Sequence, residues 1–302
     1  MKSLVTGGAG FIGSNLVDHL LSKGHEVIVL DNFYTGKKKN LSHNLKKNLK
    51  VIKVDISKNK KLNKYFKDVN YVFHLAALAN FIQSIKYPKK FYKINVIGTL
   101  NILKAAKKAK IKKFIYAASA SFYGTPKKFP TSEKAKIKLP HPYASTKWRA
   151  EKLIMRWSKI YKLPSISLRL FNVYGPRINT LDGYKSVFGF FIDQKLKRKP
   201  LTIIGDGNQT RDFIHVQDTA SAMLKSALSK KEGKIYNVGF GKETKINYIA
   251  KLFGGKIKYI SPKYLETKRS LADINKIKKE LKWKPKISIE KGVKKFLNFY
   301  SK

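Results

Sequence analysis

The stretch TGGAGFIGS, Thr6 to Ser14, decides the fold into which the rest of the chain must fit. It places Gly7, Gly10 and Gly13 at three-residue intervals, between an apolar run and a segment with helical periodicity. Glycine lets the backbone turn tightly and approach a ligand closely, and the free amide groups of the following helix attract a pyrophosphate. The stretch therefore predicts a dinucleotide-binding turn between a first strand and a first helix.

Beyond this turn, short β-branched runs alternate with longer segments of helical period as far as residue 170. Such alternation is typical of a parallel sheet covered by helices, so we predict an α/β fold with a doubly wound parallel sheet of the Rossmann type. The predicted strands are Ser3–Thr6, Glu26–Leu30, Val51–Val54, Tyr71–Leu75, Lys113–Ala118 and Ser165–Leu170, and the main predicted helices are Phe11–Lys23, Phe91–Lys110 and Tyr143–Tyr161.

The pattern changes after FNVYGPR, Phe171 to Arg177. Turns rich in glycine and aspartate follow, then a predicted helix near Val216–Leu228, a short strand at Ile235–Val238 and amphipathic helices toward the end. We predict two domains, a cofactor-binding domain at residues 1–170 and a smaller C-terminal α/β lobe at residues 171–302 that binds the substrate. Some segments of the C-terminal lobe's sequence are expected to return to the cofactor-binding domain.

The composition excludes several kinds of site. A chain of 302 residues that is 43% hydrophobic can bury a large core. It has no cysteine, and its six histidines show no helical metal-ligand spacing, so we expect neither disulfides nor a metal. No run of about 18 apolar residues is present, so we expect no membrane segment and a cytoplasmic location.

The net charge of +47 raises the alternative of a nucleic-acid partner. However, only seven of the 65 basic residues are arginine, the residue suited to bidentate recognition of bases and phosphates. The lysines are spread over nearly every predicted surface. We therefore favour solvated lysine-rich faces, with non-specific adhesion to polyanions at low salt, over a specific nucleic-acid surface.

Asp31 stands at the end of the second predicted strand. A carboxylate at this place holds both ribose hydroxyls of an adenosine and repels a 2′-phosphate, so the sequence favours NAD over NADP. The lysines at 37–39 act against this preference, because their charge softens the repulsion.

Three further residues indicate proton transfer beside the cofactor. Ser119 follows the fifth predicted strand, and Tyr143 and Lys147 lie four residues apart on one face of the next helix. A free tyrosine, with a pKa of about 10, is a poor base at neutral pH, but an adjacent lysine and a positively charged nicotinamide favour its phenolate. With Ser119 holding the reacting hydroxyl, the three residues form a proton shuttle beside a hydride carrier.

Along almost its whole length the chain resembles the extended short-chain dehydrogenase/reductase family, and within it the nucleotide-sugar 4-epimerases. The resemblance rests on an ordered series of motifs: TGGAGFIGSN, LDNFYTG, HLAA, NVIGTLNIL, SASFYG, PYASTK, LRLFNVYGPR, IGDGNQTRDFIHVQD and RSLADI. It implies NAD as cofactor, a UDP-sugar as substrate and a homodimer that associates through the long helices of the first lobe.

The resemblance also implies the site residues. Catalysis is expected from Ser119, Tyr143 and Lys147. The expected cofactor-binding residues are Gly7, Gly10, Phe11, Ile12, Gly13, Asp31, Asn32, Thr35, Gly36, Asp55, Ile56, Leu75, Ala76, Ala77, Asn95, Tyr143 and Lys147. The expected substrate-binding residues are Asn80, Ser119, Ser121, Asn172, Thr202, Arg211, Lys263 and Ser270.

The residues after Ser119 help to choose the reaction. Dehydratases and decarboxylases of this kind usually carry an acidic residue there, whereas this chain has Ala120 and Ser121. Without that carboxylate we expect 4-epimerisation. Tyr143 takes the hydroxyl proton, hydride passes to NAD, and the transient 4-keto sugar turns over and receives the hydride on its other face. Dehydratase or decarboxylase activity stays an alternative, as does a nucleotide-binding module without turnover.

The sugar is expected to be decided near Ser270, three residues before the aspartate of SLAD. In the resembling family a tyrosine there excludes N-acetyl groups, so a serine favours interconversion of UDP-GlcNAc and UDP-GalNAc. Two departures point the other way. Ala120 replaces a serine that resembles an acetamido contact, and Lys263 replaces an arginine that would grip the diphosphate. We therefore expect the protein to accept both plain and N-acetylated sugars, and UDP-glucose/UDP-galactose and UDP-glucuronate are kept as alternatives.

Overall fold

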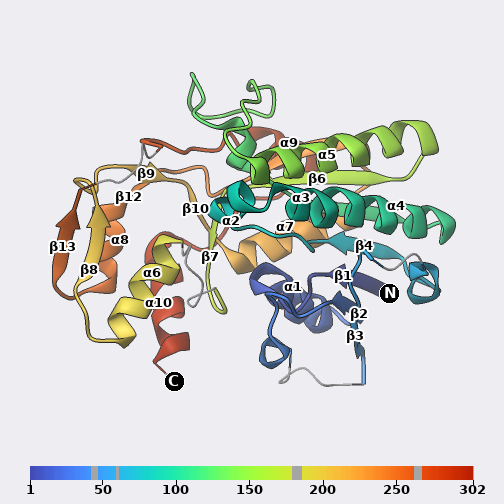
Figure 1. Ribbon diagram of the computed structural model, residues 1–302, viewed down its shortest axis with the longest axis horizontal. Helices are drawn as coiled ribbons and strands as arrows, with labels where there is room; N and C mark the ends of the chain where they lie inside the picture. Colours follow the sequence, from blue (N-terminus) through green and yellow to red (C-terminus); the bar gives the residue numbers. More distant parts are fainter. Residues whose placement is uncertain (42–46, 59–60, 179–185, 262–266, 302) are drawn as a thin grey trace.

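A seven-stranded parallel sheet organises the fold, in the order β11-β6-β5-β4-β1-β2-β3 (Figure 1). The computed structural model describes residues 1–41, 47–58, 61–178, 186–261 and 267–301. The strands are β1 (Lys2–Thr6), β2 (Glu26–Asp31), β3 (Leu49–Lys53), β4 (Tyr71–His74), β5 (Lys113–Ser119), β6 (Ser165–Leu170) and β11 (Lys234–Val238). The predicted α/β fold with a Rossmann-type sheet is confirmed.

The strand order reverses at β1, whose neighbours are β2 and β4. In open α/β sheets, ligands bind in the crevice outside the carboxyl ends of the strands at such a switch point. The β3 strand begins at Leu49 and not at Val51 as predicted, because Leu49 still pairs with Val27 of β2. The sequence pattern shows the apolar run but not the pairing that extends it.

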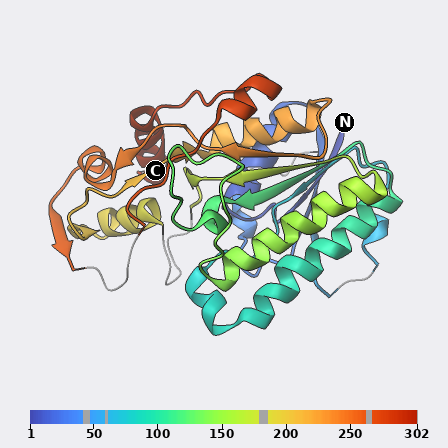
Figure 2. The same ribbon diagram turned by 90° about the horizontal axis from the view of Figure 1, so that it is seen from above.

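Helices cover both faces of the sheet (Figures 1 and 2). On one face, Val17 of α1 packs in one apolar cluster with Met223 of α7. On the other face, Ile102 of α4 and Ile154 of α5 belong to a second cluster. The bounds are α1 (Phe11–Ser22), α4 (Gly98–Lys108), α5 (Pro142–Tyr161) and α7 (Val216–Leu228). Successive β-strand residues point to opposite faces, and because both faces are covered, every residue of β4 and of β6 is buried.

The predicted helical segment around Phe91–Lys110 is present, but it is not a regular α-helix throughout. The structure divides the segment into α3 (Pro88–Tyr92), a π-helical turn η4 (Lys93–Ile97) and α4. Asn95 lies in this wide turn, and its side chain bonds to the backbone of Leu78 and to the hydroxyl of Thr146. A hydrogen bond to a segment distant in sequence leaves no mark on hydrophobic periodicity, and π-turns often occur near functional sites.

A smaller group of elements lies beside the carboxyl edge of the sheet, around a cluster of phenylalanines that includes Phe188, Phe253 and Phe296 (Figure 1). Its elements are α6 (Val187–Leu196), β8 (Leu201–Ile204), α8 (Ile246–Phe253), β13 (Ile257–Ile260) and α10 (Ile289–Tyr300). Two short pairs connect it to the sheet: β7 (Asn172–Tyr174) with β10 (Phe213–His215), and β9 (Thr210–Arg211) with β12 (Thr244–Lys245).

The remaining described elements are short: α2 (Phe81–Lys86) and α9 (Asn275–Leu281), and the 3-10 turns η1 (Lys38–Asn40), η3 (Leu62–Tyr65) and η5 (Ala120–Tyr123). The two halves of the chain are interleaved. Both β11 and α7 follow residue 170, but β11 pairs in the large sheet and α7 packs on one of its faces. Among the described residues, no helix combines the length and the apolar composition needed to cross a membrane.

A buried ion pair fixes α5 to the sheet. Glu151 of α5 and Arg169 of β6 are 1% and 5% exposed, and two guanidinium nitrogens of Arg169 donate to the carboxylate at 2.7 to 3.2 Å. Ser167 donates to the same carboxylate at 2.7 Å. The guanidinium also donates to the Tyr123 hydroxyl at 2.7 Å. Because buried charges need partners, this network sets the place of α5 on β6.

We expect Glu151→Gln to lower the free energy of unfolding by about 3 kcal/mol or more, because it leaves the Arg169 guanidinium buried without a countercharge. Urea denaturation followed by circular dichroism measures this loss. The matched control is Glu26→Gln, an exposed position at the start of β2, which we expect to change stability by less than about 0.5 kcal/mol. If both substitutions changed the free energy of unfolding by the same small amount, the buried ion pair would not fix α5 to the sheet as described.

Candidate active site

A cavity of about 530 Å³ opens at the carboxyl edge of the sheet, where β1 lies between β2 and β4. The turns after β1, β2, β3 and β4 contribute to its wall, together with the end of β5 and the start of α5. Seventeen of the predicted site residues line it: Gly7, Gly10, Phe11, Ile12, Gly13, Asp31, Asn32, Thr35, Asp55, Ile56, Leu75, Ala76, Ala77, Asn80, Ser119, Tyr143 and Lys147. Residues that are far apart in the sequence thus share one cavity, as the topology predicts.

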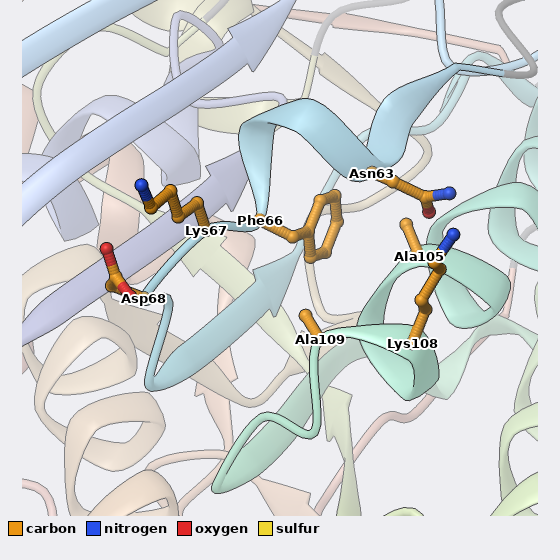
Figure 3. A pocket seen from close by; sticks show the side chains of 7 residues that line it. All are labelled: Asn63, Phe66, Lys67, Asp68, Ala105, Lys108 and Ala109. Atoms are coloured by element: carbon orange, nitrogen blue, oxygen red, sulfur yellow. The ribbon is translucent and has the colours of Figure 1, made fainter.

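A second, smaller hollow of about 200 Å³ lies between η3 and the end of α4 (Figure 3). It is lined by Asn63, Phe66, Lys67, Asp68, Ala105, Lys108 and Ala109, none of which is a predicted site residue. The larger cavity is therefore the candidate active site. Among the described residues, no group of three or more histidine, aspartate or glutamate side chains is placed to hold a metal ion.

The glycine turn after β1 is shaped by close backbone contacts. Gly7 has a φ of +71°, and a Cβ atom on it would lie 2.8 Å from the Ala76 nitrogen. A Cβ atom on Gly13 would lie 2.1 Å from the Gly7 carbonyl oxygen. The first helix begins at Phe11, and no side chain caps its amino end. The first amide groups of a helix have no acceptor within it, so this turn presents N–H donors to an anion such as a pyrophosphate.

Asp31 supplies a fixed carboxylate in the same wall. It is 7% exposed, and its two oxygens accept hydrogen bonds from the amides of Ala9 at 3.0 Å and Phe33 at 2.8 Å. Burial raises the pKa of its carboxyl group, while the two amides act in the opposite direction. Gly36 does not line the cavity, but a Cβ atom on it would lie 2.9 Å from both carboxylate oxygens. The donor set, the carboxylate and the cavity volume fit a dinucleotide.

Asn95, a predicted cofactor-binding residue, does not line the cavity. It is 1% exposed, and its amide accepts from Leu78 N at 2.8 Å and donates to Leu78 O at 3.0 Å and to Thr146 Oγ1 at 3.0 Å. Leu78 does line the cavity. Asn95 therefore ties the loop after β4 to α5.

The side chains of Ser119, Tyr143 and Lys147 approach the cavity from two elements. Ser119 ends β5, and its hydroxyl donates to the Ser121 hydroxyl at 2.9 Å. Tyr143 lies in the first turn of α5, where its amide donates to the Ser84 hydroxyl at 3.0 Å. The tyrosine ring stacks on His141, with 5.8 Å between ring centroids. The serine and the tyrosine are thus positioned by neighbours on separate elements.

Lys147 lies deeper, at 4% exposure. Its ammonium donates to the Ala117 carbonyl at 2.6 Å and lies 4.3 Å from the centroid of the Tyr116 ring. Burial lowers its pKa to about 7, although Glu151, one turn further along α5, acts against the shift. A lysine with such a pKa exchanges protons near neutral pH.

His74, at the end of β4, is fully buried beneath this group. Its two ring nitrogens meet the hydroxyls of Thr6 at 2.7 Å and Thr99 at 2.8 Å. Burial, and to a smaller degree the charge of Lys147, lowers its pKa to about 3. The imidazole is therefore neutral at physiological pH and adds no second charge below Lys147.

The predicted substrate-binding residues lie on several different elements. Asn172 and Ser270 are brought together, with 3.4 Å between the amide nitrogen and the hydroxyl oxygen. Arg211 ends β9, next to the residue whose carbonyl accepts from Asn172. Thr202 lies in β8, and both its amide and its hydroxyl bond to Gln194.

Ser121, Asn172, Thr202, Arg211 and Ser270 lie outside the cavity lining. Lys263 lies outside the described residues. The cavity therefore contains the predicted cofactor-binding residues more fully than the predicted substrate-binding residues.

The predicted site residues do not include two charged residues of the cavity wall, Lys37 and Arg177, and sequence reasoning gave Arg177 no role at all. Arg177 belongs to the quoted motif FNVYGPR, but nothing in the motif shows its partners. In the structure Arg177 has a φ of 68°, forms an ion pair with Asp18 of α1 and donates to the Asn40 carbonyl at 3.3 Å. The apolar wall residues Leu30, Val54, Ile94 and Leu170 were also missed, because a strand-end or helix residue that faces a ligand has the same pattern as one that faces the core.

The lowered pKa of Lys147 predicts how stability depends on pH. The unfolded chain keeps a lysine pKa of about 10.4, so between pH ~7 and ~10 it binds more protons than the folded state, and this group favours folding increasingly as the pH rises. We expect the unfolding free energy of the ligand-free wild type, relative to Lys147→Met, to increase across this window in urea titrations. Lys152→Met, on the exposed side of the same helix, gives the baseline. If the difference in unfolding free energy between wild type and Lys147→Met stayed constant or fell as the pH rises, the lowered pKa of Lys147 would be refuted.

Comparison with known proteins gives the family. The model of the NAD dependent epimerase/dehydratase family matches residues 3–239. The chain is 39% identical to the putative UDP-glucose 4-epimerase of Methanocaldococcus jannaschii, over 98% of this chain and 97% of that protein.

Two solved structures are also similar to this one. UDP-N-acetylglucosamine 4-epimerase from Methanobrevibacter ruminantium, in complex with UDP-N-acetylmuramic acid, has a TM-score of 0.95 at 34% identity, covering 99% of this chain and 98% of its own. UDP-glucuronic acid 4-epimerase from Bacillus cereus, in complex with UDP-glucuronic acid and NAD, has a TM-score of 0.91 at 32% identity, covering 100% and 99%. The resemblance found in the sequence is confirmed, and the chain belongs to the NAD-dependent epimerase/dehydratase family, with NAD as its cofactor.

Proposed function

We propose that this protein is a UDP-sugar 4-epimerase and that it interconverts UDP-GlcNAc and UDP-GalNAc. One observation carries the proposal: Ser119, Tyr143 and Lys147 line the same cavity as the glycine turn and Asp31. An acid–base group beside a dinucleotide site is what reversible oxidation of a sugar hydroxyl requires. The similar proteins named above are 4-epimerases of three different UDP-sugars, which supports the reaction more firmly than the sugar.

The chain's own residues supply the proton transfers. NAD, when bound, supplies the hydride acceptor and donor. Tyr143, as the phenolate, takes the proton of the C4 hydroxyl while C4 is oxidised, and returns it to the keto oxygen when C4 is reduced on its opposite face. Ser119 holds that oxygen by a hydrogen bond, and Lys147 favours the phenolate by its charge. Proton and hydride both return to the sugar, so the cycle has no net oxidation.

The turn after Ser119 supports epimerisation over elimination. Ala120 and Ser121 are the first two residues of η5, and the Ser121 amide donates to the Ser119 hydroxyl oxygen at 3.1 Å. These are the positions where a dehydratase or decarboxylase of this family is expected to place its acidic residue. A serine whose hydroxyl bonds to Ser119 does not replace a carboxylate as acid or base for elimination. Dehydratase or decarboxylase activity is therefore the less favoured alternative.

Ser270 supports the choice of an N-acetylated sugar. It is a small side chain next to Asn172, one of the predicted contacts of the nucleotide-sugar. A serine leaves space that a tyrosine would fill. UDP-glucose/UDP-galactose and UDP-glucuronate are the rival substrates, since similar proteins are named for UDP-glucose and UDP-glucuronic acid.

We also infer a homodimer formed through α4 and α5, in the cytoplasm. The inference rests on the resemblance to the family, and Ile160, at the end of α5, is 53% exposed and so available to a partner. Sedimentation velocity measures the oligomeric state directly.

We expect Tyr143→Phe to lower kcat for UDP-GlcNAc/UDP-GalNAc interconversion by about 10² to 10⁴-fold, because it removes the proton acceptor. Coupled enzymatic detection of UDP-GalNAc measures the rate. Tyr161→Phe, at the exposed end of the same helix, is the control and should keep the wild-type rate. Equal rates for Tyr143→Phe and wild type would refute the mechanism, and no turnover by the wild type on any UDP-sugar would favour a binding module.

We expect Ser270→Tyr to reduce kcat/KM for UDP-GlcNAc by at least about tenfold while sparing UDP-galactose, because the ring occupies the space of the acetamido group. Ser270→Ala keeps that space and should keep the wild-type preference. A substrate panel with UDP-GlcNAc, UDP-galactose and UDP-glucuronate separates the three cases. An unchanged preference after Ser270→Tyr would remove the basis for the sugar assignment.

A further inference from the structure

Asp212 is a fully buried carboxylate that follows directly after Arg211 and precedes β10. Its oxygens accept hydrogen bonds from three backbone amides, those of Phe240 at 2.6 Å, Gly241 at 3.0 Å and Ala272 at 3.0 Å. A carboxylate that receives several backbone N–H groups holds the segments that donate them in a fixed arrangement. Asp212 thus joins the 240–241 turn and the segment that contains Ser270.

The backbone of the same residue holds Asn172. The Asp212 carbonyl accepts from both the amide and the side-chain nitrogen of Asn172, each at 3.2 Å. The Asn172 side chain in turn lies 3.4 Å from the Ser270 hydroxyl. One residue therefore contacts the strand of Asn172 through its carbonyl and the segment of Ser270 through its carboxylate.

The surrounding packing leaves little freedom. A Cβ atom on Gly239 would lie 2.6 Å from the Ala272 side chain and 2.7 Å from an Asp212 carboxylate oxygen. The segment around Ala272 is also held from its other side, where Thr131 donates to the Leu271 carbonyl at 2.8 Å. Displacement of the carboxylate would therefore shift the neighbouring backbone, because no side-chain flexibility is available to absorb it.

We propose that Asp212 is a positioning residue that fixes Arg211, Asn172 and Ser270 relative to one another before the substrate binds. The inference rests on the proposed function, since these three are the predicted contacts of a nucleotide diphosphate sugar. Preset contacts lower the ordering cost of binding, so their loss weakens affinity more than it slows chemistry at a distant C4 carbon.

The charge of Asp212 is part of this arrangement. Burial raises its pKa to about 6, and the three amides act against that shift. At pH 8 the group is ionised, so both oxygens act as acceptors. In Asp212→Asn, one oxygen becomes an amide group that faces backbone donors, and at least one hydrogen bond is lost.

The test uses the full-length protein at pH 8. We expect Asp212→Asn to weaken UDP binding by at least about tenfold in isothermal titration calorimetry and to raise KM for the UDP-sugar similarly, with a smaller change in kcat and unchanged NAD content. Asp218→Asn is the matched control, because Asp218 is also a buried carboxylate that accepts a backbone amide, from Ile287 at 2.9 Å, but it bonds to none of the three residues. It should keep the wild-type UDP affinity.

The possible results separate the two levels of the proposal. Wild-type protein that binds neither UDP nor a UDP-sugar would refute the proposed function and this inference with it. If the wild type binds UDP and Asp212→Asn binds it with the same affinity, the inference alone is refuted. The inference is also refuted if Asp218→Asn weakens UDP binding as much as Asp212→Asn does. Should Asp212→Asn not fold, Gly239→Ala disturbs the same contacts, and normal UDP affinity there would overturn the positioning role.

Discussion

The close approach of two turns at the carboxyl edge of the sheet is the constraint on which the site depends. The turn after β1 touches the chain after β4 so tightly that the space for a Gly7 side chain is taken by the backbone of Ala76. This contact is possible because β1 and β4 are neighbours in the sheet, at the point where the strand order reverses. It places the amino end of α1 beside the loop that carries Leu75 to Asn80, and so forms the two walls of the cavity.

On this base, buried polar groups fix α5, the helix that carries Tyr143 and Lys147. The ion pair of Glu151 with Arg169 ties it to β6, and the ammonium of Lys147 ties it to the end of β5. Each of these charges is costly to bury, and each is satisfied by a partner in the sheet. The helix therefore has one well-defined position, and the proposed reacting groups obtain their geometry from the core beneath them.

The sequence was sufficient for those parts of the structure that depend on local pattern. Alternating runs predict the parallel sheet, and glycine spacing predicts the turn that Gly7 and Gly13 form. What it could not show depends on contacts between distant segments. The π-turn at Lys93–Ile97, the inward-facing place of Arg177 and the meeting of Asn172 with Ser270 each rest on partners far away along the chain. No periodicity records such pairs, so the sequence predicted the residues that line the cavity better than it predicted the contact between Asn172 and Ser270.

The late strand β11 has a consequence for how the protein is made. It pairs with β6 in the large sheet, and α7, just before it in the chain, packs beside α1 on the face that would otherwise meet water. A nascent chain that has emerged only as far as β6 therefore carries an unfinished sheet edge and an uncovered apolar face on α1. We therefore expect the large sheet and its cover to be completed only after Lys234–Val238 have been synthesised.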